Sequence, residues 1–260
     1  MLRNAFAYIT RKWPKSLLLF AIILLMGTLS LIGLSMKGAT QQASSESLGS
    51  ITNSFSMQIN RRTNPGTPRG AGNLRGEDIE KISQVEGITS SIKRINAIAD
   101  ILDHEIIETE ETLQNQSPER AKHFKNTLMV TGVNDSSKED KFVSGAYKLV
   151  QGEHLTDKDK NQILMHEDLA KKNGLKVGDK VRLKSNLYDA DNEKGANETV
   201  EVTIKGLFSG KNQAPLTYAQ ELYEDTLISD LDTAAKLYGN TVQTATYEDA
   251  TFFAKGDQDL

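Results

Sequence analysis

The chain has 260 residues, of which 25% are charged, and its formal net charge is −4 at neutral pH. This mild acidity argues against nucleic acid as a partner, because nucleic-acid binders carry a basic surface that neutralises phosphates. The sequence has no cysteine, which excludes disulfides, thiolate metal sites and a cysteine-linked lipid. The length allows one large domain or two small ones with a buried core.

Residues 17–36, LLLFAIILLMGTLSLIGLSM, are uncharged and apolar. Their number matches the roughly 20 residues that an α-helix needs to cross a bilayer. Four basic residues and no acidic residue precede them: Arg3, Arg11, Lys12 and Lys15. By the positive-inside rule we expect a cytoplasmic terminus over 1–16, one transmembrane helix over 17–36, and an extracytoplasmic domain over 37–260 in a single-pass protein of the cell membrane.

The alternative is a cleaved signal peptide, with Gly33-Leu34-Ser35 as its small-x-small site. This tripeptide lies inside the apolar run, and the run is longer than the about 7–15 residues of a usual signal h-region. We therefore expect the helix to be retained.

The first part of the extracytoplasmic region is predicted to form a β–α–β unit over about 51–102. Residues 51–62 alternate between apolar and polar side chains, which is typical of a strand, and the glycine- and proline-rich stretch 63–73 predicts a loop. A helix is expected over 76–88, with Ile79, Ile82 and Val85 on one face and Gly87 at its end. Residues 89–102 alternate again and predict a returning strand.

Short mixed elements are predicted for the remainder of the chain. Ser117 and Pro118 fit an N-cap and a first helical position. We expect strands over 126–134, 198–208 and 245–255, a charged connector over 136–142, and a helix over 230–239 that Gly239 ends. Residues 145–183 predict strand, turn, strand, short helix, turn and strand. The last part of this stretch is LAKKNGLKVGDKVRL (169–183), in which Leu169 and Leu175 pack the helix, Gly174 caps it, and Gly178-Asp179 makes the turn.

This succession indicates an α+β fold of two lobes. One lobe comprises about 51–102 and 240–260, and an outer lobe of about 126–210 is inserted into it. The sequence 169–183 is then scaffold that stiffens the outer lobe rather than a ligand contact.

A basic loop is the first candidate site: Arg61, Arg62, Arg69 and Arg75. It lacks the Gly-Lys-Ser/Thr of a phosphate loop, so a solvated hairpin loop is the preferred interpretation and contact with lipid head groups or a partner is the alternative.

Three further patterns fail as sites. The stretch DADNEKG (189–195) resembles a calcium loop but has Lys194 where glycine is required and Val200 where glutamate is required, so we expect an acidic connection between strands. The four histidines (His104, His123, His154 and His166) have no metal-ligand spacing. Ser90 and Lys93 fit S-x-x-K without a companion motif. We therefore expect no catalytic, cofactor-binding or metal-binding residues, no cofactor, and no enzymatic activity.

Several stretches together resemble one known family. They are GEHL (Gly152–Leu155), ILMHEDLAKKNGLKVGDKVRL (163–183) and VEVTIKGLF (200–208), after a basic terminus, an apolar span and a β–α–β unit. This order resembles the extracytoplasmic core domain of ABC-transporter permeases of the MacB/FtsX type. Three other stretches resemble the streptococcal Vex-type permease most: ITNSFSMQINRR (51–62), GTPRGAGN (66–73) and TGVNDSSKEDKFVSG (131–145).

The resemblance implies a permease subunit of an ABC exporter that transmits ATPase-driven movement to its extracytoplasmic domain. It implies a separate cytoplasmic ATPase subunit, a second permease chain and membrane lipid as partners, and a small peptide as cargo. Such permeases continue with three more membrane helices, so we expect this chain to be the N-terminal part of one. A membrane-anchored extracellular binding or adaptor module without energy coupling is the alternative.

Overall fold

The computed structural model describes residues 54–58, 74–115, 117–211 and 221–254, together with Pro14, Leu24, Met26 and Thr28. Residues 1–53 form one unit of the chain and residues 54–260 a second. The predicted cytoplasmic terminus (1–16), transmembrane helix (17–36) and loop (63–73) therefore lie outside the described residues, apart from the four single positions. Among the residues that are described, no helix is long and apolar enough to span a membrane.

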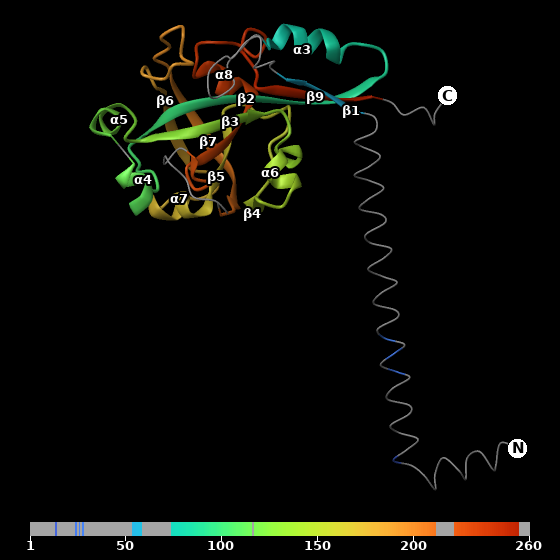
Figure 1. Ribbon diagram of the computed structural model, residues 1–260, viewed down its shortest axis with the longest axis horizontal. Coiled ribbons are helices and arrows are strands. Elements are labelled where there is room, and N and C mark those ends of the chain that lie inside the picture. Colours follow the sequence, from blue (N-terminus) through green and yellow to red (C-terminus); the bar gives the residue numbers. More distant parts are fainter. Residues whose placement is uncertain are drawn as a thin grey trace, which may run out of the picture. The chain divides into compact units, whose positions relative to one another are not determined.

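The second unit is built on one nine-stranded sheet in the described part of the chain. Its strands are β1 (Ser54–Gln58), β2 (Ile88–Leu102), β3 (Thr127–Val133), β4 (Lys148–Gly152), β5 (Gln162–His166), β6 (Lys180–Ser185), β7 (Thr199–Ser209), β8 (Thr226–Asp230) and β9 (Asp249–Ala254). The sheet and few helices agree with the expected α+β class (Figure 1).

Six of these strands close into a ring, in the order β2, β3, β8, β5, β7, β6 and back to β2. The β3–β8 and β5–β7 pairs are parallel and the other four are antiparallel. The ring closes because β2 has 15 residues and pairs with different strands along its length. It pairs with β9 over Ile88–Arg94, with β3 over Arg94–Asp100, and with β6 over Ala99–Leu102.

The predicted β–α–β unit is confirmed as β1, α3 (Gly76–Ser83) and β2, with β9 between the two strands. The helix is shorter than expected and ends at Ser83. Gly87 follows at φ +92°, and the backbone N–H of Ile88 donates to Val85 O at 3.1 Å, so the chain turns directly into β2. Val85 was expected on the buried face of the helix and is instead 56% exposed.

The other short helices are α4 (Glu110–Gln114), α5 (Pro118–His123), η1 (Ser136–Lys138, a 3-10 turn), α6 (Asp140–Val143), α7 (Glu167–Lys172) and α8 (Leu231–Lys236). The N-cap prediction is confirmed, because Ser117 Oγ accepts from Arg120 N at 3.2 Å and Pro118 opens α5. The expected connector over 136–142 is wrong in part, since η1 and α6 occupy most of it.

Strands from both predicted lobes share the sheet. Strand β2, from the first lobe, pairs with β3 and β6, which fall in the second. The proposed boundary therefore does not coincide with a break in the sheet, and the division into two lobes stays a prediction. In Figure 1, α3 and α8 lie beside one end of the ring and α7 lies at the other.

The apolar core lies on both faces of the ring strands. On β5, Ile163 and Met165 join the main cluster, whereas Leu164 points to a second cluster with Tyr147 and Phe208. Alternation along the strand produces this division, because successive side chains point to opposite faces. Both faces of β5 are thus covered.

Candidate functional site

The candidate residues from the sequence do not assemble into one centre. Of the basic loop, only Arg75 is described; it is exposed, precedes α3, and bridges to Thr246. Arg61, Arg62 and Arg69 lie outside the described residues, so the interpretation of that loop stays a prediction.

Residues 189–195 do connect two strands, β6 and β7, as expected. Three of their polar side chains, those of Asp189, Asp191 and Asn192, are buried. Asn192 Nδ2 donates to Asn186 O at 3.0 Å and to Ala196 O at 2.8 Å, and the Tyr238 hydroxyl donates to Asp189. These side chains hold the connection in shape, which explains why the loop carries buried acidic residues.

The histidines lie in separate places. His166 is buried, accepts from Asp168 N at 3.2 Å as the N-cap of α7, and its other ring nitrogen lies 2.9 Å from Gly210 O. His154 contacts Ser136 Oγ at 2.9 Å, and burial lowers its pKa. His123 stacks on Tyr188 with ring centroids 3.6 Å apart. No cluster with metal-binding geometry occurs among the described residues.

The scaffold stretch 169–183 has the predicted local structure. Leu169 is fully buried, and Gly174 and Gly178 take positive φ angles of +65° and +94°. Asn173, directly after α7, also fixes the segment that follows β2, because its side chain exchanges two hydrogen bonds of 2.9 and 2.8 Å with the backbone of Glu105. The stretch therefore stabilises chain segments on both sides of it.

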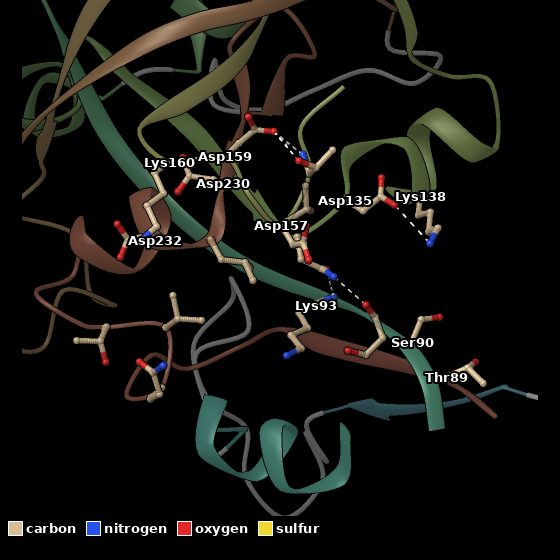
Figure 2. A pocket seen from close by; sticks show the side chains of 18 residues that line it. Thr89, Ser90, Lys93, Asp135, Lys138, Asp157, Asp159, Lys160, Asp230 and Asp232 are labelled. Carbon is tan, nitrogen blue, oxygen red and sulfur yellow. Dashed lines mark hydrogen bonds and ion pairs between the residues drawn. The ribbon is translucent and has the colours of Figure 1, made fainter. Parts of the chain in front are cut away.

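A cavity of about 910 Å³ opens beside the first half of β2 (Figure 2). Five segments line it: residues 89–93 of β2, 133–138 after β3, 156–160 before β5, the start of α8, and 241–243. Ser90 and Lys93 both contribute to its wall, but they are three apart on a strand and so face opposite sides. Lys93 Nζ lies 3.3 Å from Glu80 instead, which excludes a Ser–Lys pair of the kind that S-x-x-K requires.

The cavity lining is net acidic. It carries five aspartates and three lysines: Asp135, Asp157, Asp159, Asp230, Asp232, Lys93, Lys138 and Lys160. Most are fixed by partners within 3.4 Å, as in Lys138–Asp135 and Lys236–Asp232. The side chains of Asp157 and Lys160 are exposed and make no hydrogen bond or ion pair with a described residue. Within the part of the lining that the structure describes, one anion and one cation without such a partner are therefore available to a ligand.

Two of the aspartates make the cavity wall rigid. Asp159 accepts from Lys205 Nζ and Thr156 N, both at 2.7 Å, and although burial opposes ionisation these contacts hold its pKa below the usual value. Asp230 is buried and accepts from Thr233 N and Gln162 N, each at 2.9 Å, so it joins α8 to β5.

Neither this cavity nor Asn134, one of its lining residues, was predicted from the sequence. The Asn134 side chain accepts from Lys93 N and donates to Ser91 O, both at 2.8 Å. The only local signal is an Asn-Asp pair directly after a strand, which by itself predicts a turn. A smaller cavity of about 290 Å³ lies between Lys148, His166 and Lys211.

The amino-acid sequence and the structure were compared with those of known proteins. A family model described as MacB-like periplasmic core domain matches residues 16–253. No match was found among curated protein sequences.

Two similar solved structures are the extracellular domain of the noncanonic ABC-type transporter YknZ from Gram-positive bacteria and the periplasmic region of MacB from Actinobacillus actinomycetemcomitans. The first is 13% identical, covers 79% of this chain and 84% of its own, and has a TM-score of 0.40. The second is 16% identical, covers 79% and 76%, and has a TM-score of 0.42. TM-scores this low carry no argument, so the assignment rests on the family model. Because that model spans most of the sequence, the chain belongs to the family of MacB-like periplasmic core domains.

Proposed function

We propose that this chain is part of the permease subunit of an ABC exporter and that residues 37–260 lie outside the cell membrane. The observation that carries the proposal is the family match over residues 16–253, which includes the apolar segment as well as the folded domain. The same match favours a permease over an anchored adaptor module without energy coupling.

The membrane placement is part of the proposal. Residues 17–36 would cross the bilayer once, with the basic residues before them on the cytoplasmic side. Strand β1 follows this segment in the chain and pairs with β9, which pairs with β2. A pull on the membrane segment would thus reach the ring of strands through continuous backbone hydrogen bonding.

The partners are inferred from the family. The sequence contains no nucleotide-binding motif, so a separate ATPase subunit would supply the energy. A second permease chain and membrane lipid complete the assembly, and the Vex-type stretches support a small peptide as cargo. The chain itself would then catalyse no reaction.

The absence of cysteine gives a direct test of orientation. Single cysteines are introduced at Gln151, which is exposed on β4, and at Asn4 in the basic terminus. A membrane-impermeant maleimide applied to intact cells should label Q151C, and should label N4C only after lysis. Labelling of N4C on intact cells, or recovery of Q151C from the medium, would contradict the membrane placement.

Export is tested in the organism that encodes the chain. Deletion of residues 74–254 should remove a subset of peptides from the medium and raise their level in the cells, and the intact gene should restore them. Inactivating the nucleotide-binding motif of the ATPase should give the same peptide profile. Unchanged peptides in both strains would refute the export of a peptide cargo.

A further inference from the structure

One edge of β2 is open beside the large cavity. Strand β3 pairs with β2 only from Arg94 onward, whereas β2 begins at Ile88. Among the described residues, no strand pairs with 88–93 on this edge, and β9 occupies the opposite edge. Thr89 and Ser90 are exposed, and both line the cavity. An unpaired strand edge presents backbone donors and acceptors that can bind another extended chain.

Asn134 shows which groups this edge presents. Its carboxamide accepts from Lys93 N and donates to Ser91 O, which are the two contacts that a neighbouring strand would make. The side chain thus takes the place of one peptide group of β3 at the point where β3 leaves β2. Because the N–H and C=O of one strand residue point to the same edge, the Ser91 N–H faces this edge as well.

The pairing of β2 with β9 leaves Thr89 out of register, since Ile88 faces Ala254 and Ser90 faces Phe253. Thr89 is therefore a bulged residue whose backbone is not committed to β9. Its side chain donates to Phe253 O at 3.1 Å, which holds the bulge in place. The bulge interrupts the β2–β9 ladder locally at this end of β2.

We propose that the cavity binds an extended peptide that adds as a strand along residues 88–91 of β2. The inference rests on the proposed function, because it treats this peptide as the exported cargo. Main-chain hydrogen bonds to the edge would supply affinity without demanding one sequence, and the cavity walls would select side chains. The position of the edge inside a cavity of about 910 Å³ gives room for several residues of an extended chain.

The charged residues that line the cavity indicate the net charge of the peptide that it would bind. The lining carries two more acidic than basic residues, and Asp157 is the anion that has no partner among the described residues. A peptide with net positive charge fits this lining better than an acidic one. Lys160 offers a second, opposite contact, which suits a carboxylate on the same peptide (Figure 2).

The test uses the full chain in detergent with a single cysteine at Ser90, whose alkylation by a maleimide is timed. The probes are three octapeptides that alternate valine with threonine and charged residues and carry net charges of +2, 0 and −2. We expect the +2 peptide to slow alkylation of S90C most and the −2 peptide least. Replacement of Asp157 by asparagine should weaken protection by the +2 peptide about two- to five-fold, as for an exposed ion pair.

Two controls separate strand addition from other binding. The Gln151→Cys variant reports on β4, which is also an exposed edge strand, and should not be protected. The +2 peptide with every backbone amide N-methylated keeps its side chains but its backbone cannot donate. It should bind about ten-fold or more weakly, because the hydrogen bonds from its backbone to the strand edge are lost.

Three results would each contradict the proposed binding of a peptide along β2. Lack of protection by all three peptides at millimolar concentration, equal protection of S90C and Q151C, or full binding by the N-methylated peptide would overturn strand addition at β2. None of these results bears on the orientation or export tests, so the two proposals fail separately. If export of peptides is absent but S90C is protected, then the edge binds peptide and the cargo assignment is wrong.

Discussion

Replacement of Asp225 by asparagine is expected to stabilise the protein at neutral pH. Asp225 is fully buried at the start of β8, and its Oδ1 accepts from Ile107 N at 2.7 Å. Its Oδ2 has no hydrogen-bond partner among the described residues. Burial raises the pKa of this carboxyl from 3.8 to about 8, an effect that the bond from Ile107 opposes and Glu224 reinforces.

The sign of the pH dependence follows from this raised pKa. The native state keeps its proton between about pH 4 and pH 8, whereas the unfolded chain has lost it, so stability falls as pH rises through this window. With about 1.4 kcal/mol per pH unit, the penalty at pH 7 is about 4 kcal/mol. Above pH 8 both states are ionised and the penalty stays constant.

Asparagine removes this penalty and keeps the acceptor for Ile107. Its amide nitrogen takes the place of Oδ2, which has no hydrogen-bond partner among the described residues, and this costs about 1–3 kcal/mol. We therefore expect a net gain of about 1–3 kcal/mol in the free energy of unfolding at pH 7. A net loss is expected at pH 4, where the unfolded carboxyl is close to its pKa of 3.8 and the penalty has almost disappeared.

The assay is urea unfolding of the full chain in neutral detergent, followed by circular dichroism from pH 4 to pH 9. The exposed Asp157→Asn variant is the matched control and should track the parent protein at every pH. A difference between D225N and the parent that does not change with pH would refute the reasoning, because then no proton is retained on folding.

Three other predictions follow from packing and from the loop before β7. Replacement of Gly132 by alanine would place its Cβ 2.5 Å from Ala234 Cβ and should cost about 1–3 kcal/mol in urea unfolding, with partial recovery on adding Ala234→Gly. Tyr238→Phe removes the acceptor of Ile98 N and the donor to Asp189, and should lower stability by about 2–3 kcal/mol; an unchanged midpoint would show that this buried contact is not formed. Millimolar calcium should leave the melting temperature unchanged, whereas a rise that Asp189→Asn abolishes would show that residues 189–195 bind the ion.

Local signals predicted the fold well where neighbouring residues alone decide the structure. The stretch 169–183 became α7, two turns with glycine at positive φ, and β6, because caps and turns depend on a few adjacent side chains. The helix end was misplaced because Val85 completes the apolar stripe of α3, although the chain had already turned at Ser83. Apolar spacing indicates a face and does not fix where the helix ends.

Nonlocal features could not be read from the sequence. Strand β8, TLISD, is buried at every position and shows no alternation, since both of its faces are covered. The ring depends on which strands meet, and β6 reaches β2 across about 80 intervening residues. The cavity combines five separate segments, so Asn134, Asp157 and Asp230 have no common sequence signal. Only their placement by the ring brings them together.

The length of β2 links the proposed peptide site to the proposed movement. Its first half carries the open edge and pairs with β9, while its second half closes the ring with β3 and β6. A strand added at residues 88–91 would stiffen the half of β2 that connects to β9 and β1, the strand nearest in sequence to the proposed membrane segment. Conversely, a pull on β1 would act on the backbone that bounds the cavity. Binding and movement would act on one strand, and where strand addition changes the free energy of the movement, the movement changes that of strand addition by the same amount. Peptide protection at Ser90 should therefore differ between the ATP-bound and nucleotide-free forms of the assembled transporter.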